Sequence, residues 1–389
     1  MRTIGVVTTS RADYTAYRPL LKALKADPEI ALKLYVSGTH LSPEFGMTVG
    51  VIENDGFEIA ERIEIMLSSD TPEGIAKSMG VALIGFGQAF TRNCPDILVV
   101  LGDRYEMLSA ALAALPFKIP VAHIGGGDLT QGAIDDALRH SMTKLSHLHF
   151  VSTEASARRV IQLGEDPSRV IVTGEPALDE ILSAPLLSPE ELKLGFELDI
   201  DIDQPFLLVT FHPATLEYEQ AESQVDELLA ALDEAQLPVI FTMPNADTAG
   251  RVIAARMQHW IELHPGKSAM VENFGPDAYH SVLRRAVAVV GNSSSGLIEA
   301  PSFKVPTVNI GIRQAGRTRA ASVIDVSCER GEILAAIRKA ASGEFRSSLE
   351  SVVNPYASAT NSAVATIADT LKRVPLGDSL VQKKFRDQE

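Results

Sequence analysis

Carboxylates that follow apolar runs are the side chains in this sequence best placed to move protons. Asp103 comes directly after an apolar run and a glycine, Asp135 and Asp136 open a predicted helix, and Asp128 ends a Gly-Gly-Gly-Asp segment. A carboxylate at the end of a strand can serve as a general acid or base. Asp135 and Asp136 could equally serve as partners of the helix dipole, and Asp128 could simply form a turn.

His212 is the most prominent of the nine histidines, because it follows the apolar run 206–211 and precedes a proline. An imidazole there can donate a proton near neutral pH or pair as a cation with a phosphate. His123 and His140 lie near the carboxylates in the first half of the chain. Each of them could orient a carboxylate or fill the core.

A run of serines, Ser293-Ser294-Ser295-Gly296, lies between an apolar strand and a predicted helix. The N–H groups and positive dipole end of such a helix can hold a pyrophosphate. Glu299, three residues further on, could accept hydrogen bonds from ribose hydroxyls. The simpler alternative is a helix cap in which Glu299 is the capping-box partner of the serines.

Arginines follow two of the predicted strands. Arg313, Gln314 and Arg317 come after a strand that ends in Ile-Gly, and Arg11 comes after the first strand. A guanidinium at the carboxyl end of a strand can bind a phosphate through two hydrogen bonds. Solvated loop arginines would produce the same pattern.

The elements that position these residues form a repeated β-α pattern. Short apolar runs alternate with helical periodicity, which is typical of parallel βαβ units. Strands are predicted over 4–8, 32–36, 96–101, 120–124, 149–152, 206–211, 238–241, 286–290 and 306–310. Helices are predicted over 17–25, 74–90, 107–115, 134–144, 221–234, 249–263, 276–285 and 295–300.

We therefore predict an α/β fold of two Rossmann-like domains that face each other across a cleft. The first domain covers residues 1–175 and the second, which binds the nucleotide, covers 176–364, with the main linker in the acidic, proline-containing segment 175–205. A length of 389 residues agrees with two domains. Polar clusters at strand ends in both halves could hold the two parts of a bipartite ligand.

Composition excludes several classes of protein. The net charge of −15 argues against a nucleic-acid partner, although a few arginines can still bind a small anion. Two cysteines are too few for a disulfide framework or a typical zinc site. The first apolar run is too short for a signal peptide, and no run is long enough to span a membrane. We therefore predict a cytoplasmic protein without a membrane partner.

Seven segments, in order along most of the chain, closely resemble the hydrolysing UDP-N-acetylglucosamine 2-epimerases of sialic acid biosynthesis. They are Ser10-Arg11-Ala12-Asp13-Tyr14, Gly102-Asp103-Arg104-Tyr105-Glu106, Gly132-Ala133-Ile134-Asp135-Asp136 with Arg139-His140, Phe211-His212-Pro213, Pro244-Asn245-Ala246-Asp247, Gly291-Asn292-Ser293-Ser294-Ser295-Gly296, and Asn309-Ile310-Gly311 with Arg313-Gln314. Together the segments are highly specific, although each one alone is not.

This resemblance implies a GT-B-like fold whose C-terminal helix, 365–389, returns to the first domain. It implies a nucleotide-sugar substrate, a homodimer or homotetramer, and neither a metal nor a nicotinamide cofactor. Asp103 and Asp135 match the catalytic carboxylates of the family, and Arg104 would support them. The UDP would be held by Arg11, His212, Asn245, Ser293, Ser294, Glu299 and Arg313.

The sequence departs from the family pattern at Gly125. Several relatives carry a catalytic glutamate two residues after the histidine that matches His123, and this chain has Gly125 there. Either Asp128 or Asp136 takes over the role of that glutamate, or proton transfer is distributed differently.

The predicted reaction converts UDP-N-acetylglucosamine and water into N-acetylmannosamine and UDP. Elimination of UDP and of the C2 proton, with Asp103 as base, would give 2-acetamidoglucal, which is then hydrated. Alternatives are a sister enzyme for a UDP-diacetamido-trideoxy sugar or a GDP-linked sugar of the legionaminic acid type, a GT-B glycosyltransferase, and a catalytically silent sugar-nucleotide sensor.

Overall fold

Two units of parallel βαβ structure make up the chain in the computed structural model. The structure describes residues 1–67, 71–130, 134–181, 186–214, 216–244, 249–272, 274–358 and 362–387. The first unit consists of Met1–Asp128, Asp135–Glu180 and Tyr356–Glu389, and the second of Leu129–Ile134 and Ile181–Pro355. Residues that follow the second unit in the sequence therefore belong to the first.

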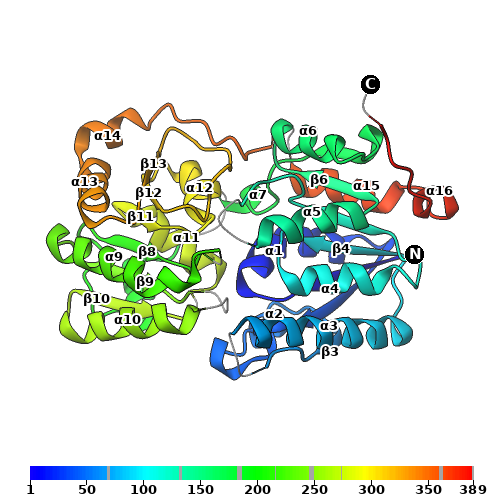
Figure 1. Cartoon of the computed structure of the whole chain (residues 1–389), viewed down its shortest axis with the longest axis horizontal. Coiled ribbons are helices and arrows are strands. Elements are labelled where there is room, and N and C mark those ends of the chain that lie inside the picture. Colours follow the sequence, from blue (N-terminus) through cyan, green and yellow to red (C-terminus); the bar gives the residue numbers. More distant parts are fainter. Residues whose placement is uncertain are drawn as a thin grey trace. The chain divides into compact units, whose positions relative to one another are not determined.

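The first unit contains a seven-stranded parallel sheet of order β3-β2-β1-β4-β5-β6-β7. This is the strand order of a Rossmann fold with one more strand at the end. Strands β3, β4 and β6 of this sheet are labelled in Figure 1. Its strands are β1 (Arg2–Thr8), β2 (Ile30–Ser37), β3 (Ile59–Ile63), β4 (Ile97–Leu101), β5 (Val121–Ile124), β6 (Leu148–Val151) and β7 (Val170–Val172). Its helices are α1 (Arg11–Ala26), α2 (Val49–Asn54), α3 (Pro72–Arg92), α4 (Tyr105–Ala114), α5 (Asp135–Leu145), α6 (Glu154–Gln162), α15 (Ala363–Arg373) and α16 (Asp378–Val381).

The second unit contains a six-stranded parallel sheet of order β10-β9-β8-β11-β12-β13, again the Rossmann order. Its strands are β8 (Leu207–Thr210), β9 (Val239–Thr242), β10 (Ser268–Val271), β11 (Ala288–Gly291), β12 (Thr307–Ile310) and β13 (Val323–Val326). Its helices are α8 (Pro189–Phe196), α9 (Ala221–Ala235), α10 (Gly250–Leu263), α11 (Gly275–Arg285), α12 (Ser295–Ile298), α13 (Arg330–Ala341) and α14 (Gly343–Ser348), while α7 (Leu178–Ile181) lies at the boundary of the two units.

The central strands are apolar because both of their faces are covered. All residues of β5, β6, β8 and β11 are buried, including those on alternate faces, as expected for a parallel sheet between two layers of helices. The apolar runs of the sequence predict every one of these strands. They predict no strand at β3, β7, β10 or β13, which are the four edge strands of the two sheets. Their half-exposed residues break the apolar run from which a strand is predicted.

Helix α1 begins six residues earlier than the predicted start at Tyr17. Ser10 is its N-cap and forms a capping box with Asp13: the Asp13 carboxylate accepts the backbone N–H of Ser10 at 2.8 Å. This box satisfies N–H groups of the first turn. Arg11 is consequently the first residue of the helix.

The segment predicted as the main linker is partly folded into the second unit. Ser188 and Glu191 form a capping box that starts α8. Leu192 is fully buried and belongs to a core cluster with Ile200, Ile202 and Phe206. Because this segment contains acidic residues and prolines, the sequence pattern predicts a linker where the structure has a short amphipathic helix.

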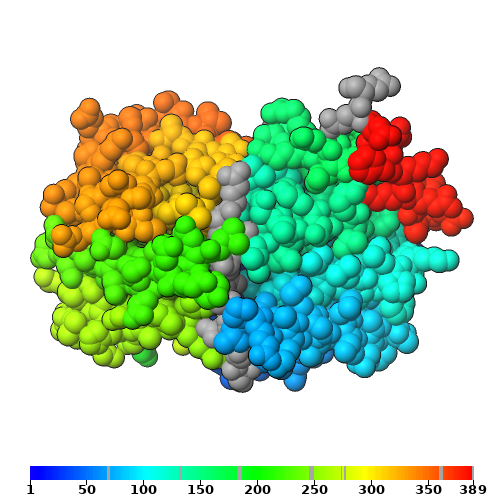
Figure 2. All heavy atoms as spheres, viewed as in Figure 1, coloured from blue at the N-terminus to red at the C-terminus, as the bar shows by residue number. Residues whose placement is uncertain are grey.

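The C-terminal part of the chain packs on the first unit. Val364, Ile367 and Leu371 of α15 belong to the core cluster that contains the strands of that unit. Figure 2 shows the C-terminal segment, in red, on the surface of the molecule. In the part of the chain that the structure describes, no helix is long and apolar enough to cross a membrane.

Candidate functional site

In the first unit, an ion pair and a hydrogen bond of Arg139 join the ends of two strands. Gly102 follows β4 with φ +76°, and this turn presents Asp103 at the carboxyl end of the sheet. The guanidinium of Arg139, 2% exposed, pairs with the carboxylate of Asp103. Its Nη1 donates to the carbonyl oxygen of Gly125, after β5, at 2.9 Å. Arg139 therefore connects Asp103 to the neighbouring strand.

The sequence position of Arg139 predicts no role in the site, although the residue lies within a family-like segment. The available signal was its place on a helix that opens with two aspartates. A buried guanidinium needs a charged or polar partner, but the sequence does not reveal that this partner is Asp103.

His123 contacts the same turn with an uncharged imidazole ring. Its ring is fully buried in β5, and burial lowers its pKa to about 3. One ring nitrogen can then donate an N–H and the other accept. Nε2 lies 2.8 Å from the carbonyl oxygen of Gly102, and Nδ1 lies 3.4 Å from Oγ1 of Thr143.

The departure from the family pattern at Gly125 has a backbone cause. Gly125 has φ +79°, a left-handed conformation that disfavours any residue with a Cβ atom. With this backbone, a glutamate at position 125 would be strained.

Asp128 is held by two serines. It is 5% exposed, and its Oδ1 accepts hydrogen bonds from Oγ of Ser152 at 2.9 Å and Oγ of Ser156 at 2.5 Å. These bonds tie the loop after β5 to the end of β6 and to α6. They account for the buried carboxylate without a role in proton transfer, so a catalytic Asp128 stays a prediction.

The other charged candidates of the first unit lie at helix starts. Asp135 is the first residue of α5, and Asp136 lies 3.5 Å from Nε2 of His140. Arg104 precedes α4 and pairs at 3.0 Å with Glu106, whose carboxylate is fully buried. Arg11 is partly exposed at the start of α1.

In the second unit, Asn292 brings three strand ends together. Its Oδ1 accepts the backbone N–H of His212 at 2.7 Å, and its Nδ2 donates to the carbonyl oxygen of His212 at 2.8 Å. Its own carbonyl oxygen accepts from Nη1 of Arg313 at 3.2 Å and from Nε2 of Gln314 at 2.9 Å. His212 follows β8, Asn292 follows β11 and Arg313 follows β12, so two predicted ligands of the UDP share one buried anchor.

The hydrogen bonds of the serine run differ from those of the capping box that the sequence allows. Helix α12 has a single turn, and its N-cap Ser294 forms no side-chain cap. Glu299 instead accepts from Oγ of Ser295 at 2.9 Å, and Oγ of Ser295 lies 2.6 Å from the hydroxyl of Tyr279. The capping-box alternative is therefore wrong.

The surroundings of Glu299 favour its ionised form. Burial raises its pKa, but His280 and Ser295 act in the opposite direction and the pKa is lowered overall. An ionised carboxylate only accepts hydrogen bonds, which suits it to hydroxyl donors.

Two candidates remain, Arg317 and Asn245. The side chain of Arg317 donates to the carbonyl oxygen of Leu129 at 3.1 Å, within the second unit. Asn245, a predicted ligand of the UDP, lies outside the described residues.

Comparison with known proteins identifies relatives along nearly the whole chain. Residues 22–372 match the family model of UDP-N-acetylglucosamine 2-epimerase. The chain is 40% identical over 346 residues, 89% of either chain, to the GDP/UDP-N,N'-diacetylbacillosamine 2-epimerase (hydrolyzing) of Campylobacter jejuni. It is 39% identical to the polysialic acid biosynthesis protein P7 of Escherichia coli over 96% of this chain and 95% of that protein. It is 37% identical to the UDP-N,N'-diacetylbacillosamine 2-epimerase (hydrolyzing) of Legionella pneumophila, over 87% of this chain and 89% of that protein.

Solved structures agree in fold. The UDP-GlcNAc 2-epimerase of Neisseria meningitidis bound to UDP-GlcNAc matches with a TM-score of 0.79 and 19% identity, over 95% of this chain and 99% of that one. The predicted GT-B-like α/β fold is confirmed by these neighbours and by the two Rossmann sheets. With its matched sequence, its fold and its strand-end clusters, this chain belongs to the UDP-N-acetylglucosamine 2-epimerase family.

Proposed function

We propose that this protein is a hydrolysing 2-epimerase that converts UDP-N-acetylglucosamine and water into UDP and N-acetylmannosamine. The observation that carries the proposal is the carboxylate of Asp103, held at the end of β4 by the buried guanidinium of Arg139. In a chain of this family, a base at that position supplies the proton transfer that epimerisation needs.

The reaction begins with loss of UDP because the C2 proton of an N-acetylhexosamine is not acidic. Breaking the bond between C1 and the UDP oxygen gives C1 a positive charge, which acidifies C2–H. Arg313, His212 and the backbone amides of the serine run would stabilise the charge that develops on the departing pyrophosphate. Asp103 then takes the C2 proton, and the products of this step are UDP and 2-acetamidoglucal.

Hydration completes the epimerisation. Water adds its oxygen to C1 of the glucal, and a proton returns to C2 from the opposite face, which gives N-acetylmannosamine. Asp135, at the start of α5, is the proposed partner of Asp103 in this step. Two carboxylates with different environments suit the two opposite proton transfers.

A second candidate substrate is a UDP- or GDP-linked 2,4-diacetamido sugar. The relatives from Campylobacter jejuni and Legionella pneumophila, both named as diacetylbacillosamine 2-epimerases, favour it. The chemistry at C1 and C2 would be unchanged, because both sugars carry a nucleotide at C1 and an acetamido group at C2. The difference would lie in the residues that contact C4 and C6.

Proton NMR in deuterium oxide tests the proposal. Incubation with UDP-N-acetylglucosamine is expected to release UDP and N-acetylmannosamine that carries deuterium at C2. Turnover of only the diacetamido sugar nucleotides would select the second substrate. Release of UDP with an unepimerised, undeuterated sugar would contradict the 2-epimerase reaction and favour glycosyl transfer to water.

A further inference from the structure

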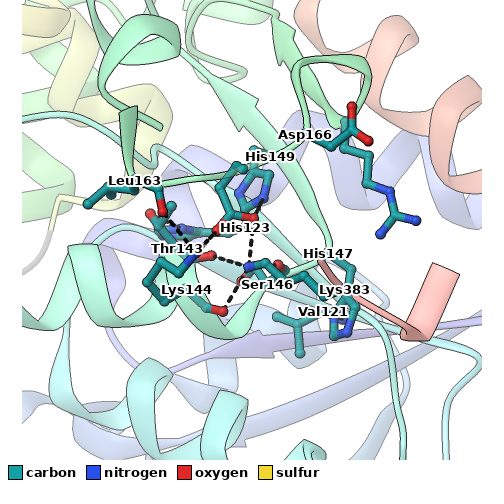
Figure 3. Close-up of polar contacts among 12 residues, drawn as sticks. Val121, His123, Thr143, Lys144, Ser146, His147, His149, Leu163, Asp166 and Lys383 are labelled. Carbon is teal, nitrogen blue, oxygen red and sulfur yellow. Dashed lines mark hydrogen bonds and ion pairs between the residues drawn. The ribbon is translucent and has the colours of Figure 1, made fainter. Parts of the chain in front are cut away.

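The C-terminal segment places a lysine at the end of the helix that carries Arg139. Nζ of Lys383 donates to the carbonyl oxygens of Ser146 at 2.6 Å, Lys144 at 2.7 Å and Thr143 at 3.1 Å (Figure 3). Thr143 and Lys144 belong to the last turn of α5. Carbonyl groups there have no partner within the helix, and a cation favours the negative end of the helix dipole.

The same ammonium group pairs with a buried carboxylate. Nζ of Lys383 lies 2.6 Å from Oε2 of Glu165, which is 2% exposed. Oε2 also lies 3.0 Å from Nε2 of His149, and Oε1 lies 2.6 Å from Nζ of Lys144. Burial lowers the pKa of Lys383 to about 8, so its ammonium still carries a charge at pH 7.

Two paths lead from this cluster to the turn that holds Asp103. Along α5, Oγ1 of Thr143 donates to the carbonyl oxygen of Arg139 at 3.2 Å, and Arg139 pairs with Asp103. Across the sheet, His149 on β6 is the register partner of His123 on β5, and His123 contacts the carbonyl oxygen of Gly102 at 2.8 Å. Both paths end at Gly102 and Asp103.

We propose that Lys383 is a positioning residue for Asp103: it caps α5 and neutralises Glu165, and thereby holds Arg139 and His123 against the Asp103 turn. This inference rests on the proposed role of Asp103. Without the ammonium, three carbonyl groups at the end of α5 lose a donor and Glu165 loses a cation. Glu165 keeps Lys144 and His149 but loses one of its two ammonium partners, and a buried carboxylate with less compensation is costly. The expected response is a shift of the end of α5.

Other contacts hold the C-terminal segment in place independently of Lys383. Nη1 of Arg169 donates to the carbonyl oxygen of Leu380 at 3.0 Å, and the backbone N–H of Arg386 donates to Gly164 at 2.9 Å. Arg386 also pairs with Asp166 at 2.7 Å. A change at Lys383 therefore removes the ammonium group without freeing the whole segment.

The test compares Lys383→Met, which replaces the ammonium-bearing chain by an unbranched apolar side chain one atom shorter, with Lys384→Met at the exposed neighbouring position. A displacement of about 1 Å at a reacting group costs on the order of 10²-fold in rate. We expect kcat of Lys383→Met to fall by about 10- to 100-fold, whereas KM and the Kd for UDP stay within about twofold. Lys384→Met should match the parent protein, and Lys383→Arg should recover most of the lost kcat.

Hydrogen exchange provides a readout that does not depend on turnover. In Lys383→Met, faster amide exchange is expected in α5 and at residues 102–104, while the second unit exchanges as before. If Lys383→Met does not fold, Glu165→Gln is the second variant: it removes the carboxylate, keeps the ammonium, and should lower kcat in the same direction.

Two outcomes would overturn the inference: a folded Lys383→Met with unchanged kcat and unchanged exchange in α5, or parallel losses of kcat and UDP affinity with faster exchange throughout the chain. A parent protein that turns over no sugar nucleotide would instead contradict the proposed function. The exchange experiment would then still decide whether Lys383 controls the Asp103 turn.

Discussion

The buried guanidinium of Arg139 forms an ion pair with the partly exposed carboxylate of Asp103 across 36 positions of sequence, between helix α5 and the turn after β4. The guanidinium also donates to the carbonyl oxygen of Gly125. A planar guanidinium reaches the two acceptors from two separate nitrogens in a rigid geometry, whereas a lysine has a single nitrogen on a flexible stem. The pair therefore fixes the position of the proposed base.

Replacing Asp103 by asparagine should abolish turnover without loss of nucleotide binding. The amide keeps the shape of the side chain but cannot take the C2 proton, so kcat should fall by about 10³-fold or more. The Kd for UDP, measured by calorimetry, should change by less than about twofold, and the exposed Asp199→Asn is the matched control. Weak binding of UDP by Asp103→Asn would show that this carboxylate serves the nucleotide instead.

Arg139→Lys should behave almost like a deletion of the side chain. A lysine has one terminal nitrogen and cannot reproduce the two positions from which Nη1 and Nη2 reach Gly125 and Asp103. Depriving a buried charge of its partner typically costs about 3 kcal/mol. Urea unfolding should show most of this loss in Arg139→Met and much of it in Arg139→Lys. In the double variant Arg139→Met with Asp103→Asn, the loss should be smaller than the sum of the two single losses. Additive losses would mean that the two side chains do not interact in solution.

Gly125→Ala should destabilise the protein although its Cβ meets no close neighbour. The nearest atoms, in Gly102, would lie 3.8 Å from that Cβ, so the cost of about 1–2 kcal/mol comes from the φ of +79°. Gly87→Ala is the control, because Gly87 lies within α3 with open space around it and should gain up to about 1 kcal/mol. Equal thermal stabilities of the two variants would contradict the backbone explanation for the missing glutamate.

Asn292→Asp should weaken UDP binding. An aspartate can still accept the N–H of His212, but it has no donor for the carbonyl oxygen of His212. The lost hydrogen bond and the added charge beside a proposed phosphate site should raise the Kd for UDP by about tenfold or more. Calorimetry at two salt concentrations separates the charge effect, and Asn292→Ser measures the loss of the amide alone. A Kd unchanged in both variants would remove Asn292 from the nucleotide site.

Acid should weaken the first unit through Glu165. Burial raises the pKa of this carboxyl group, but His149, Lys144 and Lys383 outweigh burial and hold it at about 2, below the ordinary value of 4.5. A lowered folded-state pKa adds stability above pH 4.5 that is lost as the pH falls toward 2. The unfolding free energy of the parent should thus exceed that of Glu165→Gln by about 3 kcal/mol at pH 7, and this excess should shrink as the pH approaches 2. Exposed Glu58→Gln is the control, and a difference independent of pH would contradict the assignment.

Local pattern was sufficient for most of the architecture. Each central strand is an apolar run because helices cover both faces of the sheet, so the order of strands and helices could be predicted. The edge strands could not, because exposure on one side removes the apolar run. Helix α8 was not predicted either, because it lies in the acidic segment before β8. That Leu192 of α8 packs in the core of the second unit is evident only in the structure.

The sequence by itself determined which residues stand at strand ends. Asp103, His212 and Arg313 each follow an apolar strand, and parallel strands deliver their carboxyl ends to one edge of a sheet. Only the tertiary structure decided their partners: Arg139 for Asp103, Asn292 for His212 and Arg313, and Lys383 for the end of α5. These partners lie 21 to 240 residues apart in sequence. No periodicity or spacing records such a pairing, because it arises only when the sheet brings distant segments together and burial requires every charge to find a partner.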